Sequence, residues 1–508
     1  MYESAMAVRD IDTVCILGGG TAGWMTAAGL SNKLKGLGVA ITVIESDAIG
    51  TVGVGEATLP HIRFFNRSIG LDEAEFMRAT NATFKLGIEF RDWGALGQRY
   101  VHPFGNYGAP LEGHDFHQLW LRLRAAGEAH GAGRLDDYSF PVLAAENDKF
   151  QHPGDDPNRI GSNFGYAYQM DSGAYAALLR RYAEANGVIR VEGKVVGHAR
   201  DPDTGHVRDV ALEDGRAVPA QLFVDCSGFR GVLIEEALGT GYDDWREWLP
   251  VDRAFAVQCE GGGAASPYTR ATAREAGWQW RIPLQHRVGN GHVYCSEYVS
   301  DDAARERLTS TLEGPAITEP RQLFFTTGKR RRLWNANVVA VGLSGGFLEP
   351  LESTSIHLIQ LGLTNLLELF PDASVAAADR DEYNRRMDLE FERIRDFLLL
   401  HYVATRRDDT PMWRHFRALT LPDSLSGKID AWMTRGYLSR YEFGVFLPPS
   451  WVAVMLGQGL VPRGYDPGVD GLDMDAVRGW AGQVRAATRD AVADTSRHDA
   501  YLARMMAA

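Results

Sequence analysis

The sequence reads Val14-Cys15-Ile16-Leu17-Gly18-Gly19-Gly20-Thr21-Ala22-Gly23, an apolar run followed by a glycine-rich turn. This order predicts a buried strand, a tight turn and the start of a helix. Gly18 permits the turn, Gly20 lets the backbone approach a pyrophosphate, and Gly23 lets the helix pack closely on the strand. Amide groups at the start of the helix then face the phosphates. The run predicts a dinucleotide-binding site, with a purely structural glycine turn as the alternative.

A second strand and a second glycine-rich loop follow. Residues 40–44 predict the strand, and Glu45 at its end is placed to accept hydrogen bonds from a ribose. Five residues later the sequence reads Gly50-Thr51-Val52-Gly53-Val54-Gly55. A second loop of this kind suits a large, flat cofactor that needs backbone on two sides. The two loops together favour FAD over NAD.

Composition narrows the class of protein. The 508 residues carry a net charge of −13, which argues against nucleic acid or an anionic membrane as a partner. The first ten residues lack the apolar stretch of a signal peptide, and no window of about 18 apolar residues predicts a transmembrane helix. We therefore expect a cytoplasmic protein. Cys15 and Cys226 lie in apolar, strand-like runs that predict reduced core residues, and no Cys/His cluster has metal-ligand spacing.

Four segments, taken in order, give the sequence a resemblance to a known family. They are residues 50–60, residues 81–87 around Lys85, the run Trp278-Gln279-Trp280-Arg281-Ile282-Pro283, and residues 342–354. Together they resemble the flavin-dependent tryptophan halogenases, from about residue 11 to about residue 365. The Trp-x-Trp-x-Ile-Pro signature is specific to that family. The resemblance implies an FADH2-dependent halogenase. It leaves open that this chain is an indole-preferring member of the family.

The pattern of elements predicts an α/β fold with an FAD-binding, Rossmann-like domain. Residues 11–60 predict a β-α-β unit, residues 61–135 helices with loops, residues 188–225 a three-stranded meander, and residues 337–341 the last strand of the dinucleotide domain. Residues 250–330 predict a β-sheet substrate layer. We expect a discontinuous FAD-binding and halogenase core over residues 1–365 and a mainly helical region over residues 366–508 that closes the substrate pocket.

Lys85 and Glu352 are the catalytic residues that the resemblance implies. Lys85 matches an essential lysine whose buried amine hydrogen-bonds hypohalous acid, or becomes a haloamine, and delivers an electrophilic halogen. Glu352 faces Lys85 in the family, where it polarises the hypohalous acid or takes the ring proton. The local sequence alone favours other roles for both residues, with Lys85 as a surface lysine and Glu352 as an acid at a helix N-terminus. Glu349 is a second carboxylate that carries less weight.

The resemblance also implies the cofactor and halide sites. The cofactor residues are Gly18, Gly20, Thr21, Ala22, Gly23, Glu45, Val52, Val54, Gly55, Ala57, Val195, Leu343 and Ile356. Backbone N–H groups of Thr354 and Ser355 suit a halide because they open a helix. Ser355 replaces a glycine of the family, so the preference for chloride or bromide is left open. Trp278 and Trp280 are implied to lie beside the flavin and to keep an organic substrate away from it, although core packing accounts for the same alternation.

Three residues are implied to contact the substrate. His102 and Phe104 match a His-Pro-Phe stretch that stacks on the indole ring in the family, and Trp451 is the candidate for a further aromatic wall. Residues 441–451 are shorter than the family's counterpart, and we find no match there for the partners that hold an amino acid's charged groups. Their absence favours indole, a substituted indole or another electron-rich arene over free tryptophan.

The resulting hypothesis is a two-component halogenase that uses reduced FAD, O2 and chloride or bromide. Its partners are a separate flavin reductase and a small aromatic substrate, while a homodimer, the native substrate and the regiochemistry are left open. One alternative is a flavin-dependent aromatic hydroxylase. Such enzymes usually carry Gly-Asp where this chain has Gly342-Leu343. The other alternative is a flavin-storing or sensor protein, in which Lys85, Glu352 and the two tryptophans would have no role.

Overall fold

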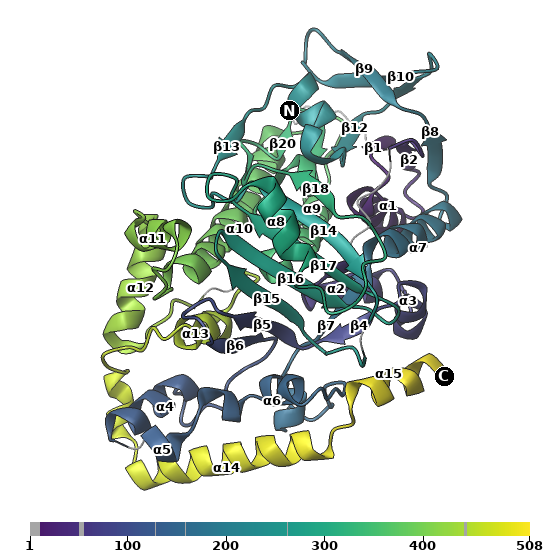
Figure 1. Ribbon diagram of the computed structural model, residues 1–508. Coiled ribbons are helices and arrows are strands. Elements are labelled where there is room, and N and C mark those ends of the chain that lie inside the picture. The colour runs from purple at the N-terminus through teal and green to yellow at the C-terminus, as the bar shows by residue number, and fades with distance from the viewer. Residues whose placement is uncertain are drawn as a thin grey trace, which may run out of the picture. The chain divides into compact units, whose positions relative to one another are not determined.

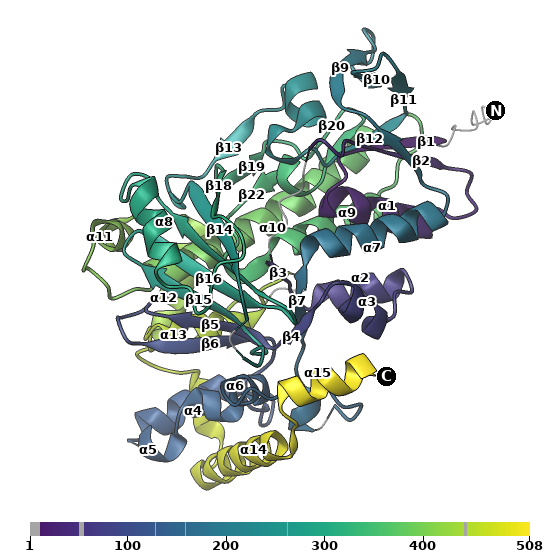
Figure 2. The same cartoon turned by 45° about the vertical axis from the view of Figure 1, so that its right-hand side comes forward.

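The structure is a computed structural model that describes residues 11–49, 55–127, 129–157, 159–261, 263–440 and 444–507 (Figures 1 and 2). The chain divides into two compact units, each assembled from three segments. Unit 1 combines Met1–Asn81, Met170–Pro250 and Phe324–Glu392. Unit 2 combines Ala82–Gln169, Val251–Leu323 and Arg393–Ala508. The division at residue 365 that we expected from the sequence stays a prediction.

Unit 1 is built on a six-stranded, mainly parallel sheet. Its strands, in spatial order, are β20 (Trp334–Asn335), β21 (Val338–Ala340), β12 (Leu222–Asp225), β1 (Thr13–Leu17), β2 (Ala40–Glu45) and β8 (Ile189–Glu192). All neighbours pair in parallel except β20, which is an antiparallel edge strand. The strands are rich in Val, Ile, Leu and Phe because parallel sheets are covered on both faces. This arrangement confirms the predicted α/β class with a Rossmann-like parallel sheet.

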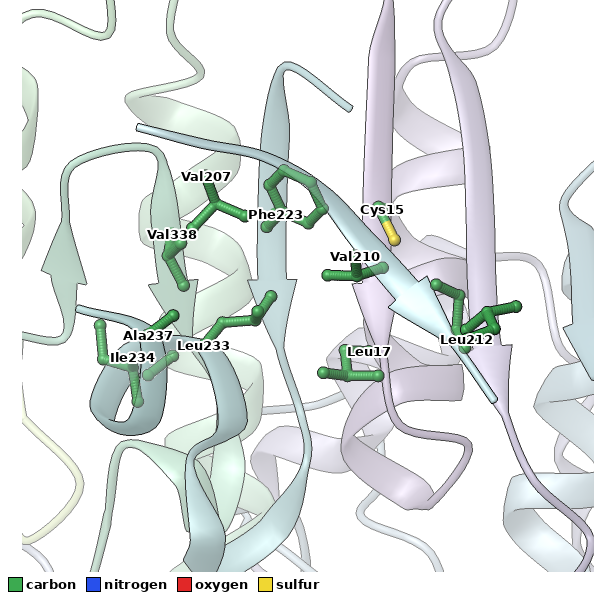
Figure 3. Close-up of a cluster of buried hydrophobic side chains, with 12 residues drawn as sticks. Cys15, Leu17, Val207, Val210, Leu212, Phe223, Leu233, Ile234, Ala237 and Val338 are labelled. Atoms are coloured by element: carbon green, nitrogen blue, oxygen red, sulfur yellow. The ribbon is translucent and has the colours of Figure 1, made fainter. Parts of the chain in front are cut away.

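One face of this sheet packs against a small antiparallel ribbon and a helical turn (Figure 3). The ribbon is the meander β9 (Val195–Arg200), β10 (Val207–Leu212) and β11 (Ala217–Pro219), and the turn is the π-helix η4 (Val232–Ala237). Figure 3 shows Val210 of β10 over Cys15 of β1. Val14 and Ile16, which alternate with Cys15, are also buried, so both faces of the central strand are covered.

Helices α1 (Thr21–Lys33), α7 (Ser172–Ala185) and α9 (Ser355–Glu368) complete unit 1, with α1 in contact with the other two. Unit 1 also contains α2 (His61–Ser68), α3 (Glu73–Ala79), β3 (Gly55–Ala57), β13 (Tyr242–Asp244), β19 (Gly328–Arg330) and β22 (Gly346–Phe347). The β-α-β unit and the last strand near residue 338 were therefore predicted correctly. The meander expected over residues 188–225 was right only in its middle strand, β10, because the first and third expected strands correspond mainly to β8 and β12, which pair in the parallel sheet.

Unit 2 contains a seven-stranded sheet. Its order is β18 (Arg321–Phe324), β14 (Arg253–Cys259), β17 (Val288–Tyr294), β16 (Gly277–Pro283), β15 (Thr269–Arg274), β5 (Gly87–Arg91) and β6 (Arg99–Pro103). Helix α8 (Asp301–Thr309) packs Ala304 and Leu308 against Phe255, Val257 and Tyr294 of this sheet, beside β14 in Figure 1. The strands expected between residues 250 and 330 are present.

The expectation of helices and loops over residues 61–135 was wrong in its middle part. After α2 and α3 the chain forms β4 (Thr83–Lys85), β5 and β6 before helix α4 (Phe116–Ala125). β5 pairs in parallel with β15 and antiparallel with β6. Because β15 lies some 180 residues further along the chain, the local sequence holds no signal for this pairing.

The C-terminal part is helical, as expected. Its helices are α10 (Ala377–Val403), α11 (Pro411–Ala418), α12 (Asp423–Arg435), α13 (Pro448–Gly457), α14 (Met474–Asp494) and α15 (His498–Ala507). Three further elements are α5 (Ala129–Ala132), α6 (Phe140–Glu146) and β7 (Ala167–Asp171). Among the described residues, no helix is long and apolar enough to cross a membrane. All four cysteines are free thiols, which agrees with the reduced state predicted for Cys15 and Cys226.

Candidate active site

The turn between β1 and α1 has the geometry of a phosphate cradle. Gly18 has a φ of 117°, and a Cβ added there would stand 2.3 Å from the carbonyl oxygen of Cys226. A Cβ on Gly23 would stand 1.8 Å from the carbonyl oxygen of Gly18. At Gly20, in contrast, a Cβ would meet nothing within 4 Å. Two glycines thus allow the close packing of the turn, and the third leaves open space at the N-terminus of α1, where a pyrophosphate fits.

The acid at the end of β2 is held in a fixed position. Glu45 accepts hydrogen bonds from Trp24 Nε1 at 3.2 Å, from Arg180 at 3.1 Å and from Arg190. A carboxylate has about four acceptor positions, so capacity for a ribose hydroxyl remains. A Cβ on Gly19 would stand 1.5 Å from Glu45 Oε2, so this glycine makes room for the acid. The sequence reasoning did not assign a purpose to Gly19.

A second turn meets the start of α1. η5 (Gly342–Ser344) follows β21, and Gly342 has a φ of 76°. A Cβ on Gly342 would lie 2.8 Å from the Cβ of Ala22, which shows how closely the two glycine turns approach. Leu343 in this turn is half-buried, and Ile356 in the first turn of α9 is buried. The two turns form a glycine-lined end of the parallel sheet that fits a dinucleotide such as FAD.

The other predicted cofactor residues are more scattered. Gly55 and Ala57 are buried in β3, Thr21 begins α1, and Val195 is half-buried at the start of β9. Val52 and Val54 lie outside the described residues. The role of each of these residues in holding the cofactor stays a prediction.

The segment that carries Glu352 is strained. Glu349, Glu352 and Ser353 have φ values of 89°, 66° and 61°, in the left-handed region that non-glycine residues avoid. Each such residue costs about 1–3 kcal/mol and persists only where the surroundings enforce it, often at functional sites. Glu349 and Glu352 are almost fully buried. The strain fixes the direction of the Glu352 side chain through the main chain.

Helix α9 begins at Thr354 and Ser355, as the sequence predicted. Glu352 lies in a short 3-10 turn, η6 (Leu351–Ser353), Thr354 is the N-cap, and Ser355 is the first helical residue. Leu358 N–H donates to the Thr354 carbonyl oxygen at 2.9 Å. Thr354 is buried and Ser355 is half-buried at the helix N-terminus. Such a terminus favours an anion through its amides and its dipole, and the halide assignment stays a prediction.

Lys85 is fully buried at the end of β4, in unit 2. The strand pairs antiparallel with β7, where Lys85 lies opposite Ala167. The Thr83 hydroxyl donates to the carbonyl oxygen of Pro283 at 2.7 Å, at the end of the Trp-x-Trp-x-Ile-Pro strand β16. The surface position favoured by local context was therefore wrong, and the buried amine implied by the family resemblance is what the structure has.

The ring of Phe104 lies beside this lysine in unit 2, and further aromatic rings adjoin it. The Lys85 Nζ lies 5.2 Å from the centre of the Phe104 ring. The His102 ring lies 6.4 Å from Phe104, 5.5 Å from Phe397 and 6.1 Å from Phe446. The cluster brings together two predicted substrate residues and two that the sequence reasoning missed.

The third predicted substrate residue joins the same cluster. Trp451 lies 5.1 Å from Phe397, whose ring stacks on Phe446 at 3.9 Å. On its other side, Lys428 Nζ lies 5.0 Å from the Trp451 ring. We refer to His102, Phe104, Phe397, Phe446 and Trp451 as the aromatic cluster. Residues 441–443, which we also quoted for the pocket, lie outside the described residues.

The charges beside Trp451 are paired with one another. Asp396 is buried and accepts hydrogen bonds from Lys428 at 3.0 Å and from Arg395 at 2.9 Å. Since α10 supplies Asp396 and α12 supplies Lys428, no local pattern could have shown this pairing. The aromatic cluster is therefore an apolar surface, and the charged side chains beside Trp451 already pair with one another.

The two tryptophans of β16 share one face. Trp278 and Trp280 are buried with ring centroids 6.0 Å apart, and Trp278 lies 6.4 Å from Trp93. A Cβ on Gly291 of the neighbouring strand would stand 2.0 Å from the Trp280 ring, so that glycine makes room for the indole. Core packing accounts for both rings, and their role beside the flavin stays a prediction.

No cluster of His, Cys, Asp and Glu with metal-binding geometry occurs among the residues that the structure describes.

Comparison with known proteins identifies the family. The profile of the family described as tryptophan halogenase matches residues 13–474. The chain belongs to the tryptophan halogenase family. The profile thus covers both glycine turns, Lys85, Glu352 and the aromatic cluster, and it ends at the start of α14.

Individual members of the family agree with this identification. Tryptophan 6-halogenase SttH from Streptomyces toxytricini is 37% identical, and the match covers 90% of this chain and 91% of SttH. Among solved structures, BrvH, a flavin-dependent halogenase from Brevundimonas sp. BAL3, is 47% identical with a TM-score of 0.93, covering 97% of this chain and 99% of its own. Xcc4156, a flavin-dependent halogenase from Xanthomonas campestris, is 44% identical with a TM-score of 0.93, covering 98% and 99%. This member of the tryptophan halogenase family is a flavin-dependent halogenase enzyme.

Proposed function

We propose that this enzyme halogenates indole, or another electron-rich arene of similar size, with hypohalous acid that Lys85 delivers. The observation that carries the proposal is the fully buried Lys85 amine, 5.2 Å from the Phe104 ring within the aromatic cluster. A buried amine next to aromatic rings combines a group that binds hypohalous acid with a surface on which an arene stacks.

The glycine turns of unit 1 would hold FAD. Gly18, Gly20 and Gly23 would receive the pyrophosphate at the start of α1, and Glu45 would accept a ribose hydroxyl. When bound in its reduced form, FAD supplies the electrons that convert O2 and a chloride or bromide ion into hypohalous acid and water. Thr354 and Ser355 would bind the halide through their backbone amides.

The chain's own residues then direct the substitution. The Lys85 amine holds the hypohalous acid by a hydrogen bond, or as a haloamine, so the electrophilic halogen is presented from one fixed point. The arene π electrons attack the halogen while its bond to oxygen breaks, and the hydroxide leaves as water. From a haloamine, which forms with release of water, the nitrogen–halogen bond breaks instead and the Lys85 nitrogen regains a proton. As the family resemblance implies, Glu352 takes the ring proton, which balances the proton taken up by the leaving group. The aromatic cluster positions the arene by stacking and excludes water from it.

A direct experiment tests the proposed activity. The purified protein is incubated with FAD, a flavin reductase, NADH, O2, bromide and indole, and the products are analysed by mass spectrometry. A brominated indole supports the proposal. A hydroxylated indole formed without halide would contradict the proposed reaction, and no product at all would show that indole is not a substrate.

Indole is expected to be a better substrate than free tryptophan, by about tenfold or more when the two compete. Tryptophan brings an ammonium and a carboxylate, and leaving them poorly paired in a buried site costs more than 1.4 kcal/mol, the equivalent of tenfold. Lys428, Arg395 and Asp396, the charges beside Trp451, already pair with one another. Because these described charges offer no clamp for the amino-acid end, the most electron-rich carbon of indole, C3, should react. Equal concentrations of both substrates in one reaction provide the measurement, and a dominant product halogenated on the benzene ring of tryptophan would refute the expectation.

The purified protein is expected to bind FAD weakly and to oxidise NADH no faster than a buffer control. The reason is that the sequence carries one dinucleotide fingerprint, Gly18–Gly23 with Glu45, which FAD would use. Absorbance at the NADH band, recorded with and without an added flavin reductase, measures the rate. Rapid NADH consumption by the protein and FAD alone would contradict the two-component scheme.

A further inference from the structure

The strand that carries Lys85 is tied to the last helix of the chain. Within unit 2, Phe84 is the residue before Lys85 in β4, and its backbone N–H donates to His498 Nε2 at 3.3 Å. His498 is the first residue of α15 and is fully buried. The profile of the tryptophan halogenase family ends at residue 474, so this contact comes from outside the matched region.

The hydrogen bonds of His498 define its protonation state. Nδ1 lies 2.6 Å from the carbonyl oxygen of Ala265, which can only accept, so Nδ1 carries the proton. Nε2 must then be the unprotonated nitrogen that accepts from Phe84. Burial lowers the pKa of His498, which keeps the ring neutral and able to act as this acceptor. The imidazole thus links β4 to the segment around Ala265, because it accepts a hydrogen bond from Phe84 and donates one to Ala265.

Hydrogen bonds of the chain segment that carries His498 also fix the position of this residue. Its backbone N–H donates to the Asp148 carbonyl oxygen at 2.8 Å, and Phe150 N–H donates to the Ser496 carbonyl oxygen at 3.1 Å. Lys149 Nζ donates to the Val492 carbonyl oxygen at 2.7 Å, at the end of α14. The connection between α14 and α15 is therefore anchored on residues 148–150.

Ring packing joins the same elements. Phe84 stacks on Phe150 with centroids 3.9 Å apart and planes 9° apart, and Tyr501 of α15 lies 5.9 Å from Phe84. Figures 1 and 2 both show α15 close to the end of β4. These contacts hold the Phe84 side chain on one side of β4, while Lys85, the next residue along the strand, points to the other.

We propose that His498 is a positioning residue for Lys85. By accepting the Phe84 N–H, it fixes the register and tilt of β4, and so the point at which the Lys85 amine presents the halogen. The inference rests on the proposed role of Lys85. Loss of this acceptor would let the short strand shift, and a displacement of about 1 Å at a reacting group can cost about a hundredfold in rate.

The test compares three variants of the full-length enzyme. His498→Phe keeps a buried ring but removes the acceptor, His498→Gln restores a donor and an acceptor on one side chain, and Tyr501→Phe is the matched control. Tyr501→Phe keeps the ring beside Phe84 and removes only the hydroxyl that lies 2.5 Å from His152 Nδ1. Each is assayed for brominated indole, for oxidation of reduced flavin, for escaped hypohalous acid caught by an added soluble enol, and for amide hydrogen exchange at Phe84.

His498→Phe is expected to lower brominated indole about 10- to 100-fold while flavin oxidation stays within about twofold of the wild type. The missing product should appear as halogenated enol, and the Phe84 amide should exchange faster while β16 and β17 stay protected. His498→Gln should recover most of the product, and Tyr501→Phe should behave like the wild type. Loss of fold alone would instead lower product and flavin oxidation together.

Two results would overturn the inference. One is a His498→Phe enzyme with wild-type product and wild-type exchange at Phe84. The other is a folded His498→Gln enzyme that protects Phe84 as the wild type does and still loses its product. Failure of the proposed function looks different, because Lys85→Ala would then halogenate normally, whereas exchange at Phe84 reports on His498 without any catalysis.

Discussion

Lys85→Ala is expected to abolish halogenation of indole while reduced flavin is still oxidised by O2 at close to the wild-type rate. Lys85 lies in unit 2, with its Nζ 5.2 Å from the Phe104 ring of the aromatic cluster, whereas the glycine turns that would hold FAD belong to unit 1. Removal of the amine should therefore uncouple the two half-reactions. Mass spectrometry measures the halogenated product, and the recovery of the oxidised-flavin absorbance measures the rate of flavin oxidation.

Two further variants make the Lys85 result interpretable. Lys85→Met keeps most of the buried side-chain volume and removes the amine, so it should be as inactive as Lys85→Ala without a cavity. Lys35→Ala changes an exposed lysine after α1 and should leave both half-reactions unchanged. Normal halogenation by either Lys85 variant would show that the amine does not deliver the halogen.

Glu352→Gln is expected to lower the halogenation rate on the order of a hundredfold, the usual scale for one acid–base group. Glutamine keeps the size and shape of the side chain but cannot take the ring proton. The rate of product formation at saturating indole and bromide gives the effect. Folding should be nearly unchanged, as judged by thermal unfolding.

Variants of two other acids distinguish the proton-accepting role of Glu352 from a general effect of removing negative charge. Glu368→Gln changes a side chain that is 57% exposed in the last turn of α9, and it should not alter the rate. Glu349→Gln tests the second buried carboxylate of the strained segment. An unchanged rate for Glu352→Gln, together with a large loss for Glu349→Gln, would transfer the role to Glu349.

Local signals predicted the dinucleotide turn well because its physical requirements are local. The packing of Gly23 on Gly18 arises within a turn of six residues, so the spacing of these glycines encodes it, whereas the Cys226 carbonyl that faces Gly18 comes from some 200 residues further along the chain. The same holds for the two turns on either side of β10, which carry their own glycine and aspartate residues, but not for the outer strands of the expected meander, because β8 and β12 pair in the parallel sheet. These parts of the fold follow from short stretches of sequence.

The surroundings of Lys85 could not be predicted in that way. Phe84 and Leu86 next to it do not show whether the amine is exposed, because burial depends on β7, β16 and α15, which lie far away along the chain. Phe397 and Phe446 complete the aromatic cluster from positions about 300 residues beyond His102. Only the resemblance to a family indicated a buried lysine, and only the structure identified its neighbours.

The fit between Gly19 and Glu45 limits how related sequences can diverge. A side chain at position 19 would occupy the space of the Glu45 carboxylate, which Trp24, Arg180 and Arg190 hold in place. The added Cβ would also stand 2.5 Å from the Cβ of Glu45, so even a shortened side chain at position 45 would clash with alanine at position 19 unless the backbone moved. Related sequences are therefore expected to keep glycine at position 19, whichever side chain stands at position 45.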